Sequence, residues 1–159
     1  MSSDMTVQCD NGLINIHVGA IIMKDGKILM VDSERNDYLY SVGGRVKFGE
    51  TTEEAIIREV WEETGVRMEI DRLGFVHENY FISDAPVHSE KLIYEISFFF
   101  YMKVPDDFSL KNNIFTEEYG KEYLKWISPD DERTVYPDFF RTELIHPKNT
   151  VQYFITDGR

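Results

Sequence analysis

The sequence contains a single cysteine, Cys9, so the chain cannot form an internal disulfide. Its N-terminus, MSSDMTVQCD, has no basic segment followed by an apolar stretch, which a secretory signal would require. The most apolar run, residues 96–102, is much shorter than the roughly 20 residues that cross a bilayer, and we interpret it as a buried strand. These absences predict a cytoplasmic protein that does not enter a membrane.

Basic residues are also few, with 17 Lys and Arg against 29 Asp and Glu and a net charge of -12 at pH 7. Proteins that hold nucleic acid by neutralising phosphates need a broad basic surface, so we expect no DNA binding. The same acidity repels anionic substrates. A phosphate-containing substrate would therefore require metal ions or local Lys and Arg side chains at its site.

Hydrophobic residues make up 42% of the 159 positions, enough to bury one sizeable core. No repeat or linker divides the sequence, so we predict a single domain over residues 1–159. Apolar and β-branched patterns predict extended segments at residues 13–23, 27–32, 38–42, 66–82, 92–104, 123–127 and 151–155. The first two are expected to pair through the turn dipeptide Asp25-Gly26. The polar residues 105–121 predict an exposed loop.

Two helices are expected. Thr51 and Glu54 have the spacing of a capping box, which predicts a helix start, and Gly65 is a natural left-handed terminator. We expect this helix to bury its Ile residues and Trp61 against a sheet. A second helix, residues 137–145, is predicted to begin with a proline in its first turn.

The first helix is unusual in its carboxylates. Glu59, Glu62 and Glu63 stand at i, i+3 and i+4 and so share one face, where their mutual repulsion opposes helix stability unless a positive charge neutralises it. A divalent cation such as Mg²⁺ prefers such hard oxygen ligands, and Arg58 could also hold one or two of the acids. A solvated surface is the usual explanation of a glutamate-rich helix taken alone.

The wider spacing is more specific. Gly44, Glu50 and the run REVWEETGV at residues 58–66 match every fixed position of G-x5-E-x7-R-E-U-x-E-E-x-G-U, where U is a bulky aliphatic residue. The sequence thus resembles the Nudix family. This resemblance implies an α/β fold, an α/β/α sandwich around a mixed β-sheet, and hydrolysis of a nucleoside diphosphate linked to another group, X, with Mg²⁺ or Mn²⁺.

By the same resemblance, Glu59, Glu62 and Glu63 would bind the metal, with the Gly43 carbonyl completing the set. Glu50 and Arg58 would orient the loop and the helix. Either Glu59 or Glu62 would act as general base. These assignments make Glu59, Glu62 and Arg58 the expected catalytic residues.

Family members often add a distal acidic ligand, for which Glu118 and Glu122 are candidates, although a solvated acidic loop explains them equally well. Arg45 and Lys47 could contact substrate phosphates or simply reduce repulsion around the acidic helix. His77, in the strand segment HENYF, is a candidate substrate-binding residue, with a hydrogen-bonded structural role as the alternative.

Other functions with this fold are less favoured. A nucleotide-sensing module without catalysis usually has a damaged box, and this box retains every acid. An isopentenyl diphosphate isomerase would need a cysteine in its pocket, whereas Cys9 precedes the first predicted strand. By analogy with the family, a homodimer is possible. The sequence does not identify the X group of the substrate, because specificity resides in loops and strands outside the box.

Overall fold

The computed structural model describes residues 2–110, 114–117 and 120–159. Its N-terminal half contains β1 (Thr6–Cys9), β2 (Gly12–Ile21), β3 (Met23–Lys24), β4 (Lys27–Ser33), β5 (Leu39–Arg45), α1 (Thr52–Thr64) and β6 (Glu69–Ile82). The remainder contains a 3₁₀ turn η1 (Pro86–His88), β7 (Leu92–Lys103), β8 (Ile114–Glu117), β9 (Gly120–Ile127), β10 (Val135–Tyr136), α2 (Phe140–Glu143) and β11 (Gln152–Asp157).

Within the described residues, eleven strands form one mixed sheet. Its main order is β11-β6-β7-β2-β5-β4-β9-β8, while β1, β10 and β3 add to β2, β5 and β4. The pairs β2/β7, β5/β10 and β6/β11 are parallel and the others are antiparallel. The predicted mixed sheet is therefore confirmed.

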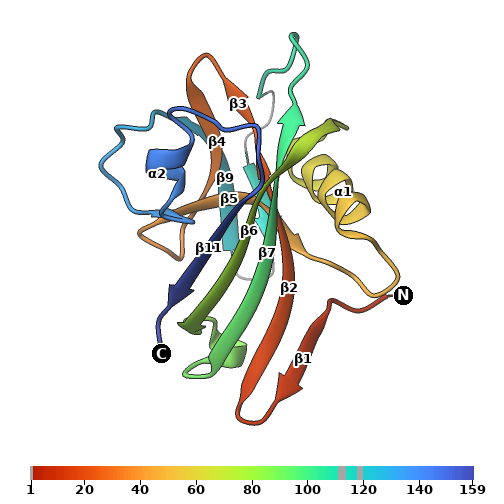
Figure 1. Cartoon of the computed structure of the whole chain (residues 1–159), viewed down its shortest axis with the longest axis vertical. Helices are drawn as coiled ribbons and strands as arrows, with labels where there is room; N and C mark the ends of the chain where they lie inside the picture. The colour runs from red at the N-terminus through yellow and green to blue at the C-terminus, as the bar shows by residue number, and fades with distance from the viewer. Residues whose placement is uncertain (1, 111–113, 118–119) are drawn as a thin grey trace.

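The sheet carries a separate apolar cluster on each face, because successive side chains of a strand point in opposite directions. Leu29 packs in one cluster with Ile56 of α1, whereas the next residue, Met30, packs in the other cluster with Phe140 of α2. Figure 1 shows α1 and α2 on opposite sides of the strands. The α/β/α arrangement predicted from the family resemblance is thus confirmed, with a very short helix in one outer layer.

Three predicted elements differ from the structure. The Asp25-Gly26 turn forms, with both φ angles positive, and pairs the end of the first predicted segment with the second through Met23↔Ile28. The long strand β2 of that segment does not pair with β4, because β5 lies between them. The predicted second helix shortens to the four residues of α2.

The predicted exposed loop at residues 105–121 was also wrong in part. Ile114–Glu117 forms β8 and pairs with β9, so backbone hydrogen bonding overrides the polar composition there. Phe108, in the same segment, is buried in the cluster beneath α1.

Trp61 is not buried, contrary to the prediction. Its exposed fraction is 47%, because α1 turns Ala55, Ile56 and Val60 toward the sheet and the next residue lies about 100° further round the helix. The Arg67 guanidinium lies over the indole, 5.0 Å from its centroid, which gives Trp61 a favourable partner at the surface.

No described helix has the length and apolar character needed to span a bilayer.

Candidate active site

The ends of α1 are fixed by local sequence. The Thr51 hydroxyl accepts a hydrogen bond from the Glu54 backbone N–H at 3.2 Å, and the Glu54 carboxylate accepts one from the Thr51 N–H at 2.8 Å. At the other end, Gly65 adopts a left-handed φ of 74° and its N–H donates to the Trp61 carbonyl. Both predicted boundaries are confirmed, so the register of every acid on this helix is set.

Two glycines at the end of β5 allow close packing on either side. A Cβ on Gly43 would lie 2.1 Å from the Val18 carbonyl oxygen of β2, so only glycine fits between these strands. A Cβ on Gly44 would lie 2.5 Å from the carboxyl carbon of Glu59. The Glu59 carboxylate thus occupies the space that a side chain at position 44 would fill.

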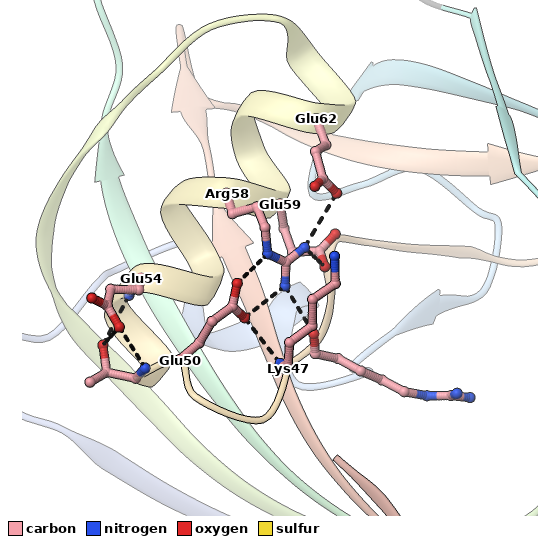
Figure 2. A network of polar contacts seen from close by, with 8 residues as sticks. Lys47, Glu50, Glu54, Arg58, Glu59 and Glu62 are labelled. Atoms are coloured by element: carbon pink, nitrogen blue, oxygen red, sulfur yellow. Dashed lines mark hydrogen bonds and ion pairs between the residues drawn. The ribbon is translucent and has the colours of Figure 1, made fainter. Parts of the chain in front are cut away.

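Arg58 lies at the centre of the carboxylates that the box brings together, as Figure 2 shows. Its Nε and one terminal nitrogen donate to the two oxygens of Glu50 at 2.5 and 3.0 Å. The other terminal nitrogen donates to Glu59 at 2.6 Å and to Glu62 at 3.3 Å. A further bond at 3.2 Å reaches the Arg45 carbonyl, so Arg58 ties the helix to the loop.

These contacts change the electrostatics of the site. The Arg58 hydrogen bonds are the largest cause that lowers the pKa of Glu50, and the Lys47 backbone N–H adds to the effect at 3.0 Å. The Glu50 hydrogen bond is likewise the first cause that raises the pKa of Arg58. Both side chains are only about one-fifth exposed, so the pair remains charged in partly desolvated surroundings.

Glu59 and Glu62 sit in different environments although both bind Arg58. The Glu59 side chain is 13% exposed and lies against Gly44, whereas the Glu62 side chain is 45% exposed. Glu59 is therefore the more restrained carboxylate, and Glu62 is more open to solvent and ligands.

Tyr40 connects the box to the distal part of the chain. Its hydroxyl donates a hydrogen bond to the carboxylate of Glu122 on β9. Burial, this bond and the charges of Glu122 and Glu63 all raise the pKa of Tyr40, so the hydroxyl stays protonated. Glu122, a predicted distal ligand, thus bonds a tyrosine whose pKa is also raised by the charge of Glu63. The other candidate, Glu118, lies outside the described residues.

A segment near the N-terminus pairs with the box loop. The Met5 N–H donates to the Val46 carbonyl at 2.7 Å, and the Phe48 N–H donates to the Ser3 carbonyl at 2.8 Å. The Arg45 guanidinium approaches Asp4 at 3.8 Å. The loop that presents Glu50 is therefore held by backbone bonds on a second side.

A family comparison gives these residues a context. The family model of the NUDIX domain matches residues 14–145, which is most of the chain. This chain belongs to the Nudix family. The resemblance read from the box is thereby confirmed, and the match extends well beyond it to include β4, β7 and β9.

Individual Nudix relatives match over shorter stretches. A "MutT-like protein" of Streptomyces ambofaciens is 39% identical over 61 residues, 38% of this chain and 40% of the relative. An "ADP-ribose pyrophosphatase" of Methanocaldococcus jannaschii is 41% identical over 67 residues, 40% of each chain. The matched region thus spans about two-fifths of each curated relative. Among solved structures, the MutT protein from Methanosarcina mazei superposes with a TM-score of 0.54 at 26% identity, over 84% of this chain and 91% of that one.

His77 does not lie with the Nudix box residues. It is buried, its Nε2 lies 2.8 Å from the Thr156 hydroxyl, and it packs edge-on against Phe139 on the α2 side of the sheet. Burial lowers its pKa, which favours the neutral ring. These contacts support the structural alternative and give the substrate-binding prediction no support.

Arg45 and Lys47 keep their two interpretations. Arg45 approaches Asp4, while Lys47 extends from the loop toward α1 in Figure 2 and its charge contributes to the lowered pKa of Glu50. The effect on Glu50 agrees with a role for Lys47 in reducing repulsion, and that role stays a prediction. Contact with phosphate remains a prediction for both residues.

The donor set suits a divalent ion, which Nudix hydrolases in general use. In the described part of the chain, no group of three or more His, Cys, Asp or Glu side chains is arranged to hold a metal, and Arg58 instead bridges Glu50, Glu59 and Glu62. The available donors are nevertheless hard carboxylate oxygens. The Glu59 carboxylate lies in the space that the missing side chain of Gly44 leaves. The residues fit the chemistry of Mg²⁺ or Mn²⁺, and the ligand assignments remain predictions.

Proposed function

We propose that this chain is a metal-dependent pyrophosphohydrolase that cleaves the diphosphate of a nucleoside diphosphate linked to another group, X. The main support is the convergence of the intact box: Arg58 binds Glu50, Glu59 and Glu62, and Glu59 lies in the space left by Gly44. A solvated surface helix would not need this arrangement. Membership of the Nudix family and the name of the M. jannaschii relative support the reaction class.

In this proposal, Glu59, Glu62, Glu63 and the Gly43 carbonyl hold Mg²⁺ or Mn²⁺, with Glu122 as a distal candidate. When bound, the ion would neutralise phosphoryl oxygens and lower the pKa of a bound water. Whichever of Glu59 and Glu62 is left free of the metal would take the proton of the attacking water as general base. The greater exposure of Glu62 makes it easier for water to reach.

Arg58 and Glu50 have a positioning role in the proposal. The bidentate pair holds the loop against the helix, and the remaining nitrogen of Arg58 restrains the two acids. Such restraint matters because misplacement by about 1 Å can cost two orders of magnitude in rate. Arg45 and Lys47 are proposed to attract the substrate phosphates against the acidic background.

We propose that the substrate of this site is a small nucleoside diphosphate compound. The acidic composition and single cysteine support a cytoplasmic protein without DNA binding, as the sequence predicts. A homodimer remains a proposal by family analogy.

The test is a screen of ADP-ribose, nucleotide sugars, dinucleoside polyphosphates and nucleoside triphosphates with Mg²⁺ and with Mn²⁺. Phosphatase-coupled phosphate release is the readout. Glu62→Gln and Glu63→Gln should each abolish turnover while leaving the fold largely intact. Glu53→Gln is the matched control, because Glu53 is an exposed acid in the first turn of the same helix.

Phosphate release that both variants retain would refute the roles assigned to these acids. Nucleotide binding without turnover of any compound would instead favour the sensing module.

A further inference from the structure

Three tyrosines lie beside the acidic part of the site, at the start of β5. Tyr40 belongs to β5, Tyr38 immediately precedes that strand, and Tyr136 comes from β10, which pairs with β5 in register Tyr136↔Tyr40. The Tyr38 ring is 4.9 Å from the Tyr136 ring at 90° and 6.4 Å from the Tyr40 ring. We call Tyr38, Tyr40 and Tyr136 the tyrosine platform.

The platform contacts the distal acid Glu122. Tyr40 donates to Glu122 and is close enough to Glu63 for that charge to affect its pKa. The Tyr38 ring lies next to both the Tyr40 ring and the Tyr136 ring, and Tyr136 is 50% exposed. Burial raises the pKa of both Tyr38 and Tyr40, and the charge of the nearby Arg35 offsets part of this rise. The platform thus extends from the carboxylates to open solvent and has a positive charge nearby.

Two of the rings are anchored through their hydroxyl groups. The Tyr38 hydroxyl donates to Asp84 at 3.0 Å, and the Tyr40 hydroxyl donates to Glu122. The β10 segment is held as well, because the Leu39 N–H donates to the Thr134 carbonyl at 2.9 Å. The rings are therefore restrained by partners far away in the sequence, and the aromatic surface is preorganised.

We propose that Tyr136 binds the nucleobase of the substrate by stacking, and that Tyr38, whose ring stands at 90° to the Tyr136 ring, holds Tyr136 in position. This inference rests on the proposed function and deepens it, because it assigns a part of the substrate to a place beside the box. A base is planar and uncharged, so an acidic neighbourhood does not repel it, and any of the four bases can stack on an aromatic ring. The diphosphate then points back along Tyr40 toward Glu63 and Glu122.

The experiment compares ligands that differ only by the base. Wild-type protein with Mg²⁺ is titrated calorimetrically with AMP, GMP, UMP, CMP and ribose 5-phosphate. We expect at least one nucleotide to bind about tenfold or more tightly than ribose 5-phosphate, which is the size of one base–aromatic stack. Tyr136→Ala should reduce nucleotide affinity to that of ribose 5-phosphate, whose own affinity should not change.

Further variants separate stacking from structural damage. Tyr136→Phe keeps the ring and should retain nucleotide affinity, and Tyr38→Ala should lose it like Tyr136→Ala. Tyr153→Ala is the matched control, because Tyr153 is similarly exposed at 57% but lies on the edge strand β11. It should bind nucleotides as the wild type does.

The proposal is overturned if no nucleotide binds better than ribose 5-phosphate, or if Tyr136→Ala and Tyr38→Ala bind nucleotides normally. Its failure is distinguishable from that of the hydrolase proposal. Nucleotide binding that depends on Tyr136, without hydrolysis of any diphosphate, would support the base-binding proposal and refute the hydrolase proposal. Hydrolysis with an unchanged KM in Tyr136→Ala would support the hydrolase proposal and refute the base-binding proposal.

Discussion

The two faces of the sheet share one framework but differ in how their outer layers are built. On one face, α1 has thirteen residues, a capping box and a glycine stop, and it carries the acids and Arg58. On the other face, α2 has only four residues, and rings from distant elements, such as Phe75, Phe139 and Phe154, fill the space. In this chain the charged residues depend on the fixed register of a long helix, whereas the rings of the other face depend on close packing.

The largest effect should come from the α2 face. Phe75 is fully buried and contacts Phe139, Phe140 and Phe154, so Phe75→Ala should lower the free energy of unfolding by about 3–5 kcal/mol. Chemical denaturation measures this loss, and activity per folded molecule should persist. Phe48→Ala is the control, since Phe48 is 77% exposed. A loss in Phe75→Ala as small as that in the control would show that this face does not determine stability.

The next effect should appear on the α1 face as lost activity. Gly44→Ala places a methyl group where the Glu59 carboxylate lies, and the resulting displacement should lower kcat about a hundredfold. Gly74→Ala is the matched variant on the other face, because its Cβ would lie 2.5 Å from a ring carbon of Tyr101. It should lower the denaturation midpoint and leave kcat unchanged. Equal activity losses in the two variants would contradict the division between the faces.

The smallest effect should be a difference in pH dependence. The folded-state pKa of His77 is below its ordinary 6.5 because of burial, so the unfolded chain takes up the proton first and stability falls as the pH drops below 6.5. The pKa of Glu50 is lowered from 4.5, chiefly by Arg58, so its contribution is present above 4.5 and is lost as the pH drops below that value.

The urea concentration at the unfolding midpoint, measured as a function of pH, tests whether His77 and Glu50 affect stability in these two different pH ranges. His77→Gln should flatten the profile just below pH 6.5, and Glu50→Gln should flatten it only below pH 4.5. The idea fails if both substitutions act in the same pH range.

The parts of the fold predicted from sequence were those fixed by near neighbours. Thr51, Glu54 and Gly65 define α1 through contacts within the helix, so its boundaries were predictable. The predicted extended segments all form strands, whereas β1, β8 and β10 were not predicted. In β8 the polar composition hid a hairpin that depends on pairing with β9. Trp61 was misplaced because it lies about 100° round the helix from Val60, outside the arc that faces the sheet.

For the site, the box motif indicated which residues matter but not how they contact one another. The bond from Tyr40 to Glu122 joins residues 82 positions apart, and that from Tyr38 to Asp84 joins residues 46 apart. Tyr40 therefore received no predicted role. Its one available signal was its place on the predicted strand that leads to the glycine pair, which is too weak to find it.

The backbone bonds from Ser3 and Met5 to the box loop have a practical consequence for handling the protein. An affinity tag joined at residue 1 would follow directly into a segment that braces the Glu50 loop, so tag removal could alter measured rates. A tag after Arg159, which is exposed and stacks on Tyr80 at 4.4 Å, leaves that brace untouched. Kinetic comparisons between variants are cleanest with the tag at that end.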